Sequence, residues 1–219
     1  MNPQELLYWV RGTGLQIAAA VFVLGMSYRI LHLLLLGRSK SLAIPRGSEW
    51  GPGLRTMWRR SVVLPELSAR GKFTLVSGYV FHLGFFVTLL FLSQHIALFR
   101  AALGVSWPAL PRSAIDISAI LSIAALIAVL AHRLVDPVKR LLSDYQDYLA
   151  WALTFLPLLS GFMLLRGIGF DYATLLTLHI LSVELLLIAA PFTKLAHMFS
   201  TFAARWYNGA IAGFKGVQA

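Results

Sequence analysis

The sequence predicts an all-α membrane protein in which five helices cross the bilayer. Of its 219 residues, 58% are hydrophobic and only 13% are charged, which is far from the composition of an average soluble domain. The apolar residues gather in five stretches, each close to the length of about 20 residues that a spanning helix needs. We therefore expect a single membrane domain over residues 1–219, with the five helices packed as a bundle.

The predicted spans cover residues 13–36, 74–98, 114–134, 148–166 and 173–198. Glu5 precedes the first apolar run, and no small-residue cleavage site follows it, so we interpret this run as a retained helix rather than a cleaved signal peptide. Residues 37–73 form the one long connection, rich in Gly, Pro and basic residues, and are predicted to be a basic cytoplasmic loop. This loop either fixes topology beside anionic lipid or docks a partner subunit.

The distribution of positive charge predicts an N-terminus outside and a C-terminus in the cytoplasm. Of the 19 Lys and Arg residues, only Arg11, Arg100, Arg112 and Arg166 lie on one side of the predicted spans. The positive-inside rule assigns the other, richer side to the cytoplasm. Because topology alone demands such basic residues, the net charge of +10 does not indicate a nucleic-acid partner.

The chain has no cysteine, and this limits its redox chemistry. Disulfides, thiolate-bound iron–sulfur clusters in this chain and covalent haem attachment through a C-x-x-C-H motif are all excluded. Any redox centre must be held by His or Met. The sequence also lacks a nucleophile–base pair and a phosphate-binding Gly loop, so we expect no catalytic substrate site of its own apart from a quinone site.

Four of the six histidines fall in two predicted spans. His82 and His95 lie in the second span, and His179 and His197 lie in the fifth. In antiparallel helices His82 matches the depth of His197, and His95 matches that of His179, so each pair can supply both axial ligands of a haem iron. Interhelical hydrogen bonding is the other interpretation of such histidines.

The spacing of these histidines sets two further expectations. His179 and His197 are 18 residues apart, which on one continuous helix is a whole number of turns and places both on one face. The 13 residues between His82 and His95 turn the two side chains about 140° apart, so tilt, a local bulge or a different approach angle must compensate.

Three other polar residues lie at or near membrane depth. His32 and His132 fall at the inner ends of the first and third spans, where we expect a structural, interfacial role. Glu184 stands alone among apolar residues of the fifth span. A carboxyl group at this depth is expected either to take up protons during quinone chemistry or to bond a Ser or Tyr of another helix.

Three segments carry a family resemblance: "YVFHLGFF" (79–86), "HRLVDPVKRLLSDYQDYL" (132–149) and "LHILSVELLLIAAPFTKLAHMFS" (178–200). They resemble the cytochrome b gamma subunit of respiratory nitrate reductase and its relatives, among them the membrane cytochromes that accompany heterodisulfide-reductase-like iron–sulfur proteins. The resemblance implies a five-helix bundle with two b haems in the bacterial cytoplasmic (inner) membrane. It also implies that His82 and His197 ligate the inner haem, and His95 and His179 the outer one.

The resemblance implies an electron relay between the quinone pool and a cytoplasmic iron–sulfur partner subunit. The longer spacing between His82 and His95 and the different loop 37–73 favour a relative of the nitrate reductase subunit with another catalytic partner. Two other classes stay open: a haem-free membrane anchor and a small metal-ion or proton transporter. The transporter class predicts acidic or cysteine ligands within the spans and broken helices around the site.

Overall fold

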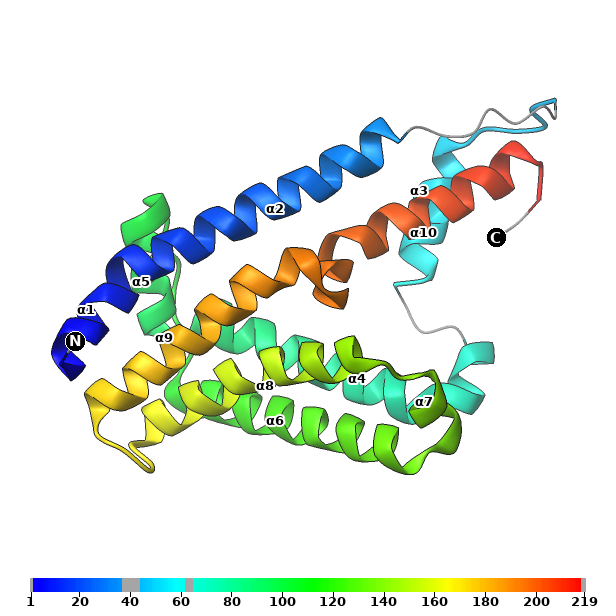
Figure 1. Cartoon of the computed structure of the whole chain (residues 1–219). Helices are drawn as coiled ribbons and strands as arrows, with labels where there is room; N and C mark the ends of the chain where they lie inside the picture. Colours follow the sequence, from blue (N-terminus) through cyan, green and yellow to red (C-terminus); the bar gives the residue numbers. More distant parts are fainter. Residues whose placement is uncertain (1, 37–43, 62–64, 218–219) are drawn as a thin grey trace. The chain divides into compact units, whose positions relative to one another are not determined.

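The protein is all-helical in its computed structural model, which describes residues 2–36, 44–61 and 65–217 (Figure 1). Helices make up 84% of the structure, and no strand occurs among the described residues. Within the predicted loop 37–73, residues 37–43 and 62–64 lie outside the described part.

Among the described residues, five helical segments are long and apolar enough to cross a membrane, which agrees with the predicted number of spans and indicates a multi-pass membrane protein. They are Gln4–Leu35, Gly71–Phe91, Arg112–Val135, Tyr145–Arg166 and Tyr172–Phe192. The first segment joins α1 (Pro3–Trp9), the π-helical turn η1 (Val10–Gly14) and α2 (Leu15–Leu35). The others come from α4 (Pro65–Phe91), α6 (Arg112–Val135), α8 (Tyr145–Arg166) and α9 (Tyr172–Ala189) with the 3-10 turn η2 (Ala190–Phe192).

The second predicted span is interrupted before its predicted end at residue 98. Helix α4 ends at Phe91, and Leu92 takes an extended backbone conformation with φ −74° and ψ 129°. A separate helix, α5 (Ser93–Leu103), then carries His95. The 140° offset expected between His82 and His95 on a continuous helix therefore does not apply, because the chain changes direction between them.

The fifth predicted span is interrupted as well, so the prediction of one continuous helix from His179 to His197 is wrong. After α9, the turns η2 and η3 (Lys194–Ala196) flank Thr193, whose backbone is extended at φ −120° and ψ −178°. Helix α10 (His197–Phe214) begins only then. Pro191 lies in this interruption and has no N–H to donate, which weakens an α-helical ladder at this point.

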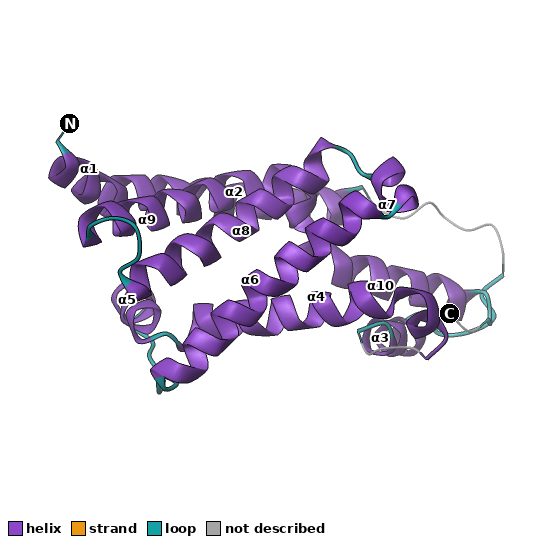
Figure 2. Ribbon diagram, turned by 90° about the horizontal axis from the view of Figure 1, so that it is seen from below, coloured by secondary structure: helices purple, strands orange, loops and turns teal. Residues whose placement is uncertain are grey.

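Contacts divide the chain into two compact units, Met1–Ala19 with Phe73–Leu187 and Ala20–Lys72 with Ile188–Ala219. In the first unit, α4, α6 and α8 lie side by side (Figures 1 and 2). Gly84 of α4 meets the Ser118 carbonyl of α6, and the Ser122 hydroxyl donates a hydrogen bond to the Phe81 carbonyl at 3.3 Å. Small residues at this contact let two apolar helices approach closely.

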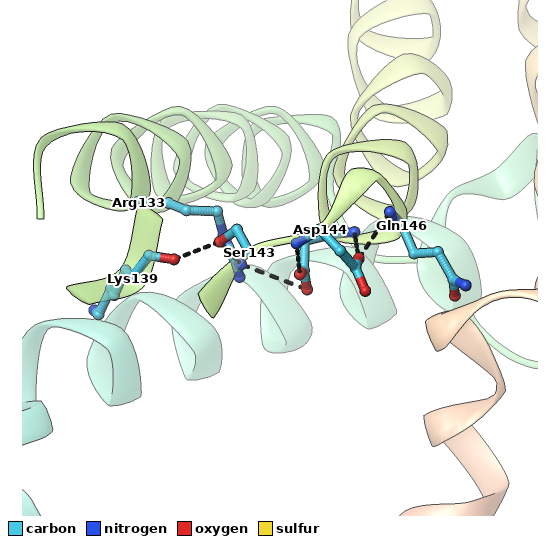
Figure 3. Close-up of polar contacts among 6 residues, drawn as sticks. Arg133, Lys139, Ser143, Asp144 and Gln146 are labelled. Carbon is cyan, nitrogen blue, oxygen red and sulfur yellow. Dashed lines mark hydrogen bonds and ion pairs between the residues drawn. The ribbon is translucent and has the colours of Figure 1, made fainter. Parts of the chain in front are cut away.

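A polar cluster holds the connection between α6 and α8 (Figure 3). Arg133, near the end of α6, donates to the Ser143 hydroxyl at 2.8 Å and forms an ion pair with Asp147 at 3.4 Å. The Asp144 carboxylate accepts the backbone N–H groups of Gln146 at 2.9 Å and Asp147 at 3.2 Å, which caps the N-terminus of α8. The connection between the two helices, which contains the short helix α7 (Pro137–Leu142), is therefore held by these polar contacts.

In the second unit, α3 (Trp50–Arg59) packs on α10 through glycine. A Cβ atom on Gly209 would lie 2.5 Å from both the Pro52 carbonyl oxygen and the Thr56 hydroxyl oxygen, and one on Gly53 would lie 2.6 Å from the Trp206 indole nitrogen. Only glycine allows this approach of the two helices. The predicted basic loop thus contains an ordered helix that is fixed to the C-terminal helix.

Two glycines of α4 offer a matched test of the helix packing. A Cβ on Gly84 would collide with the Ser122 hydroxyl and the Ser118 carbonyl, whereas one on Gly78 would meet nothing within 4 Å. We expect Gly84→Ala to destabilise the protein by about 1–3 kcal/mol through overpacking. Gly78→Ala should stabilise it by up to about 1 kcal/mol through helix propensity. Thermal unfolding in detergent, followed by circular dichroism, measures both; shifts of the same sign would contradict the packing.

Candidate functional site

Helix α4 ends before the extended residue Leu92, and its last carbonyl groups have no partners within the helix. The His95 side chain supplies two of them: its Nδ1 lies 3.0 Å from the Thr88 carbonyl oxygen and 3.1 Å from that of Leu89. Since a carbonyl can only accept, Nδ1 must carry the proton. The other ring nitrogen, Nε2, then has a lone pair, as a metal ligand requires.

The loop after α5 supplies partners for the remaining carbonyl groups of α4. The indole N–H of Trp107 donates to the Leu90 carbonyl at 2.6 Å, and the Leu110 N–H donates to the Phe91 carbonyl at 3.1 Å. The residues around this contact, Leu90, Phe91 and Trp107 to Leu110, line an open apolar cavity of about 570 Å³. The end of α4 is therefore held by His95 and by the loop after α5.

His179 of α9 lies against the backbone of α8. A Cβ atom on Gly161 would be 3.0 Å from Cε1 of the imidazole and 3.2 Å from its Nδ1. The same Nδ1 is 3.2 Å from the Ser160 hydroxyl, which is in turn 3.2 Å from the Ser182 hydroxyl. Ser182 donates to the His179 carbonyl at 2.7 Å. Two serines and one glycine thus set the position of the ring.

The structure places His95 and His179, the predicted ligands of the outer haem, close together. The rings of His95 and His179 have centres 6.2 Å apart and planes inclined by 14°. A metal–imidazole nitrogen bond is about 2 Å long, and the ring centre lies about 1 Å behind the nitrogen, so two imidazoles that hold one metal would have ring centres about 6 Å apart. The separation of these two rings would therefore allow them to hold one haem iron.

In His82 and His197, the predicted ligands of the inner haem, Nδ1 also lies beside a backbone carbonyl oxygen. In His82 this atom is 2.7 Å from the Gly78 carbonyl oxygen, and in His197 it is 2.9 Å from the Lys194 carbonyl oxygen. His82 belongs to the first unit and His197 to the second, so each is described within its own unit. A backbone acceptor at Nδ1 orients an imidazole for ligation through Nε2.

The two histidines with predicted structural roles have different surroundings. His32 stacks on Tyr28 with ring centres 5.9 Å apart, and His132 meets the edge of Phe73 at 4.6 Å. Within the described ranges, neither ring makes a hydrogen bond through Nδ1 of the kind seen in the other four. No three His, Asp or Glu side chains in those ranges gather closely enough to hold a bare metal ion.

Glu184 lies on another face of α9 from His179. Its side chain is 6% exposed, and within the described part of the chain its Oε1 has no hydrogen-bond partner. A Cβ on Gly14 would lie 2.5 Å from this oxygen, so the π-helical turn η1 brings the first span directly against the carboxyl group. π-Helical turns are frequent at functional sites.

A buried carboxylate at the opposite end of the α6–α8 pair is shared by two arginines. Asp116 lies 3.2 Å from the Arg166 guanidinium and 3.6 Å from that of Arg112. Arg112 also donates to the Leu165 carbonyl. Two positive charges on one negative charge leave this end of the helices net positive, and such a site can accept an anionic group.

Ser160, Gly161, Ser182 and Trp107 support the histidine pair, and none of them stands out in the sequence as a site residue. The available signal was the adjacent pair of small residues at 160 and 161 in the middle of an apolar span, because small residues mark close helix contacts in membranes. The role of Trp107 depends on the interruption at Leu92 and has no local signal.

Comparisons with known proteins place one relative beside this chain. A protein of Nitratidesulfovibrio vulgaris (strain Hildenborough) is 35% identical over 137 residues, and its name states no function. The aligned region covers 63% of this chain and 60% of the relative. No family model matches the chain, and no solved structure matches it.

The helix that carries His179 is capped by Asp171, which gives a pH-dependent test. The Asp171 carboxylate accepts the Thr174 hydroxyl at 2.6 Å and the Thr174 backbone N–H at 3.1 Å. These hydrogen bonds lower the pKa of Asp171, so the cap is intact at neutral pH and is lost as the pH falls through the lowered pKa. We expect Asp171→Ala to reduce the hydrogen-exchange protection of the first turn of α9 at pH 7.

Asp171→Asn is the matched control, because an asparagine side chain also caps a helix N-terminus. Its protection at pH 7 should stay close to that of the unaltered protein and should lose the acid dependence. Equal protection in the alanine variant and the unaltered protein at pH 7 would show that the cap does not hold this turn.

Proposed function

We propose that the protein is a dihaem b-type cytochrome subunit of a respiratory oxidoreductase complex. It relays electrons between the quinone pool and a cytoplasmic iron–sulfur partner subunit, as a relative of the nitrate reductase gamma subunit. The observation that supports this most directly is the pair His95 and His179, whose nearly parallel rings have the separation that two ligands of one iron require.

In this proposal His95 and His179 would hold the outer haem, and His82 and His197 would hold the inner one. Carbonyl acceptors hold the Nδ1 proton of His82, His95 and His197, and the Ser160 hydroxyl lies beside Nδ1 of His179. Such partners fix the tautomer, orient the ring and raise the basicity of Nε2. A bound haem supplies a one-electron carrier at each position.

Glu184 has a proposed role in proton transfer. A quinol that is oxidised gives up its protons along with its electrons, and a carboxyl group inside the membrane can take up a proton. Glu184 is buried and presents an oxygen without a hydrogen-bond partner in the described residues. We propose that this oxygen exchanges protons during quinone chemistry.

The absence of cysteine supports the need for a partner. The chain cannot hold an iron–sulfur cluster by thiolates, so cluster chemistry belongs to another subunit. The excess of Lys and Arg on one side of the spans supports a bacterial cytoplasmic-membrane topology with the N-terminus outside and this partner on the cytoplasmic face.

A pyridine haemochrome assay of the purified protein tests the proposal. We expect about two b haems per chain. His179→Ala and His197→Ala should each remove one of them, while His132→Ala, a histidine that contacts the Phe73 ring edge, should keep both. A preparation without haem would overturn the relay and favour an anchor or a transporter.

A second variant keeps all four histidines and tests the position of one of them. Gly161→Val places methyl groups against the His179 ring, whereas Gly71 has nothing within 4 Å of an added Cβ. In a redox titration followed by haem absorbance, Gly161→Val should shift or abolish one of two haem signals, and Gly71→Val should leave both unchanged. Identical titrations of the Gly161→Val variant and the unaltered protein would show that His179 is not an iron ligand.

A further inference from the structure

Helix α3 exposes a stripe of large apolar side chains. Trp50, Leu54 and Trp58 are 69%, 51% and 74% exposed, and they follow one another at four-residue intervals. Residues at this spacing lie above one another on one face of a helix. An exposed apolar stripe of this kind indicates a surface that is covered by another component.

The other two sides of α3 have different chemistry. Gly53 and Thr56 are buried against α10, while Arg55 and Arg59 are exposed. At about 100° per residue, the two arginines lie about 120° around the helix from the apolar stripe, and the buried residues lie on the remaining side. The helix is therefore three-sided, with one side fixed, one apolar and one cationic.

Contact with α10 prevents α3 from turning about its axis. Gly209 and Gly213 of α10 leave no space between the helices, and the ring of Trp50 lies with its centre 5.3 Å from that of Trp206. Arg205 donates a hydrogen bond to the hydroxyl of Ser61, just after α3, at 2.8 Å. The direction in which the stripe faces is thus set by the packing of α3 on α10.

The position of the two helices in the chain places them beside the bilayer surface. Helix α3 follows the first span, and α10 follows the fifth. Because successive spans cross in opposite directions, the first and the fifth end on the same face of the membrane. Tryptophan favours the level of the lipid headgroups, and arginine attracts anionic phosphate there.

We propose that α3 lies in the membrane interface, with Trp50, Leu54 and Trp58 in the boundary of the acyl chains and with Arg55 and Arg59 bound to the phosphates of anionic lipids. Helix α3 itself contains no Asp or Glu that would repel such headgroups. The amphipathic pattern of an aromatic face beside an arginine side is that of helices that lie flat on membranes. This proposal does not depend on haem binding.

The chain has no cysteine, so single nitroxide labels can report where each side of α3 lies. The full-length protein would carry Leu54→Cys, Trp58→Cys or Arg59→Cys in nanodiscs of phosphatidylcholine and phosphatidylglycerol. We expect labels at 54 and 58 to be more accessible to oxygen than to an aqueous nickel complex, and the label at 59 to show the reverse. Equal nickel accessibility at all three positions would overturn the proposal.

A charge series tests the anionic lipid. With the label at 58, immersion should increase with the fraction of phosphatidylglycerol, and the double change Arg55→Gln with Arg59→Gln should abolish this dependence. Arg140→Gln removes the same charge from an exposed position on α7 (Pro137–Leu142) and should leave the dependence intact. An immersion that ignores lipid charge, or that occurs only when a purified partner subunit is added, would overturn anionic lipid as the occupant.

Discussion

The carbonyl groups in the last turn of a helix have no partner within the helix and must be satisfied by other groups. In this protein α4 stops at Phe91, and its last four carbonyl groups are taken up by one imidazole, one indole and one backbone amide. The imidazole is that of His95. The same contact that completes the backbone therefore fixes the tautomer and orientation of a side chain whose ring lies 6.2 Å from that of His179. In the proposed function, His95 would therefore have a chemical role as well as a structural one.

The ring of His179 is held mainly by packing, whereas that of His95 is held by carbonyl groups at a helix end. Gly161 lets the His179 imidazole lie against the backbone of α8, and Ser160 and Ser182 occupy the polar atoms around it. This arrangement needs small residues in the middle of an apolar helix, and it positions α9 against α8. Glu184, on another face of α9, is held by the first span through Gly14. Helix α9 thus carries both the imidazole of His179 and the buried carboxyl group of Glu184.

The apolar runs were sufficient to predict five spans, because hydrophobic length is a property of the sequence itself. The ends of two spans were not predicted correctly. Pro191 gave a local signal for the second of these errors, whereas the extended backbone at Leu92 depends on Trp107 and Leu110, which lie outside the helix.

Helix α3 was taken for a loop because glycine and proline usually form turns. Here these residues provide the close contact with α10. The proximity of His95 and His179 was expected from matched depth in antiparallel helices, although His95 lies on the separate helix α5. Ser160 and Gly161 gave only the weak signal of two adjacent small residues, and their contact with His179 depends on tertiary structure.

The hairpin of α6 and α8 is tied at both ends, by Arg133 with Asp147 and by Arg166 with Asp116. Sliding one helix along the other would break both ion pairs at once. The two helices therefore behave as a rigid hairpin of fixed length. A bilayer that is thinner than the length of this hairpin is expected to be met by inclination of the hairpin as a rigid piece, and a thicker one by local thinning of the bilayer. The His179 ring packs against Gly161 of α8. The imidazole therefore keeps its distance from the ends of the α6–α8 hairpin when the thickness of the surrounding lipid changes.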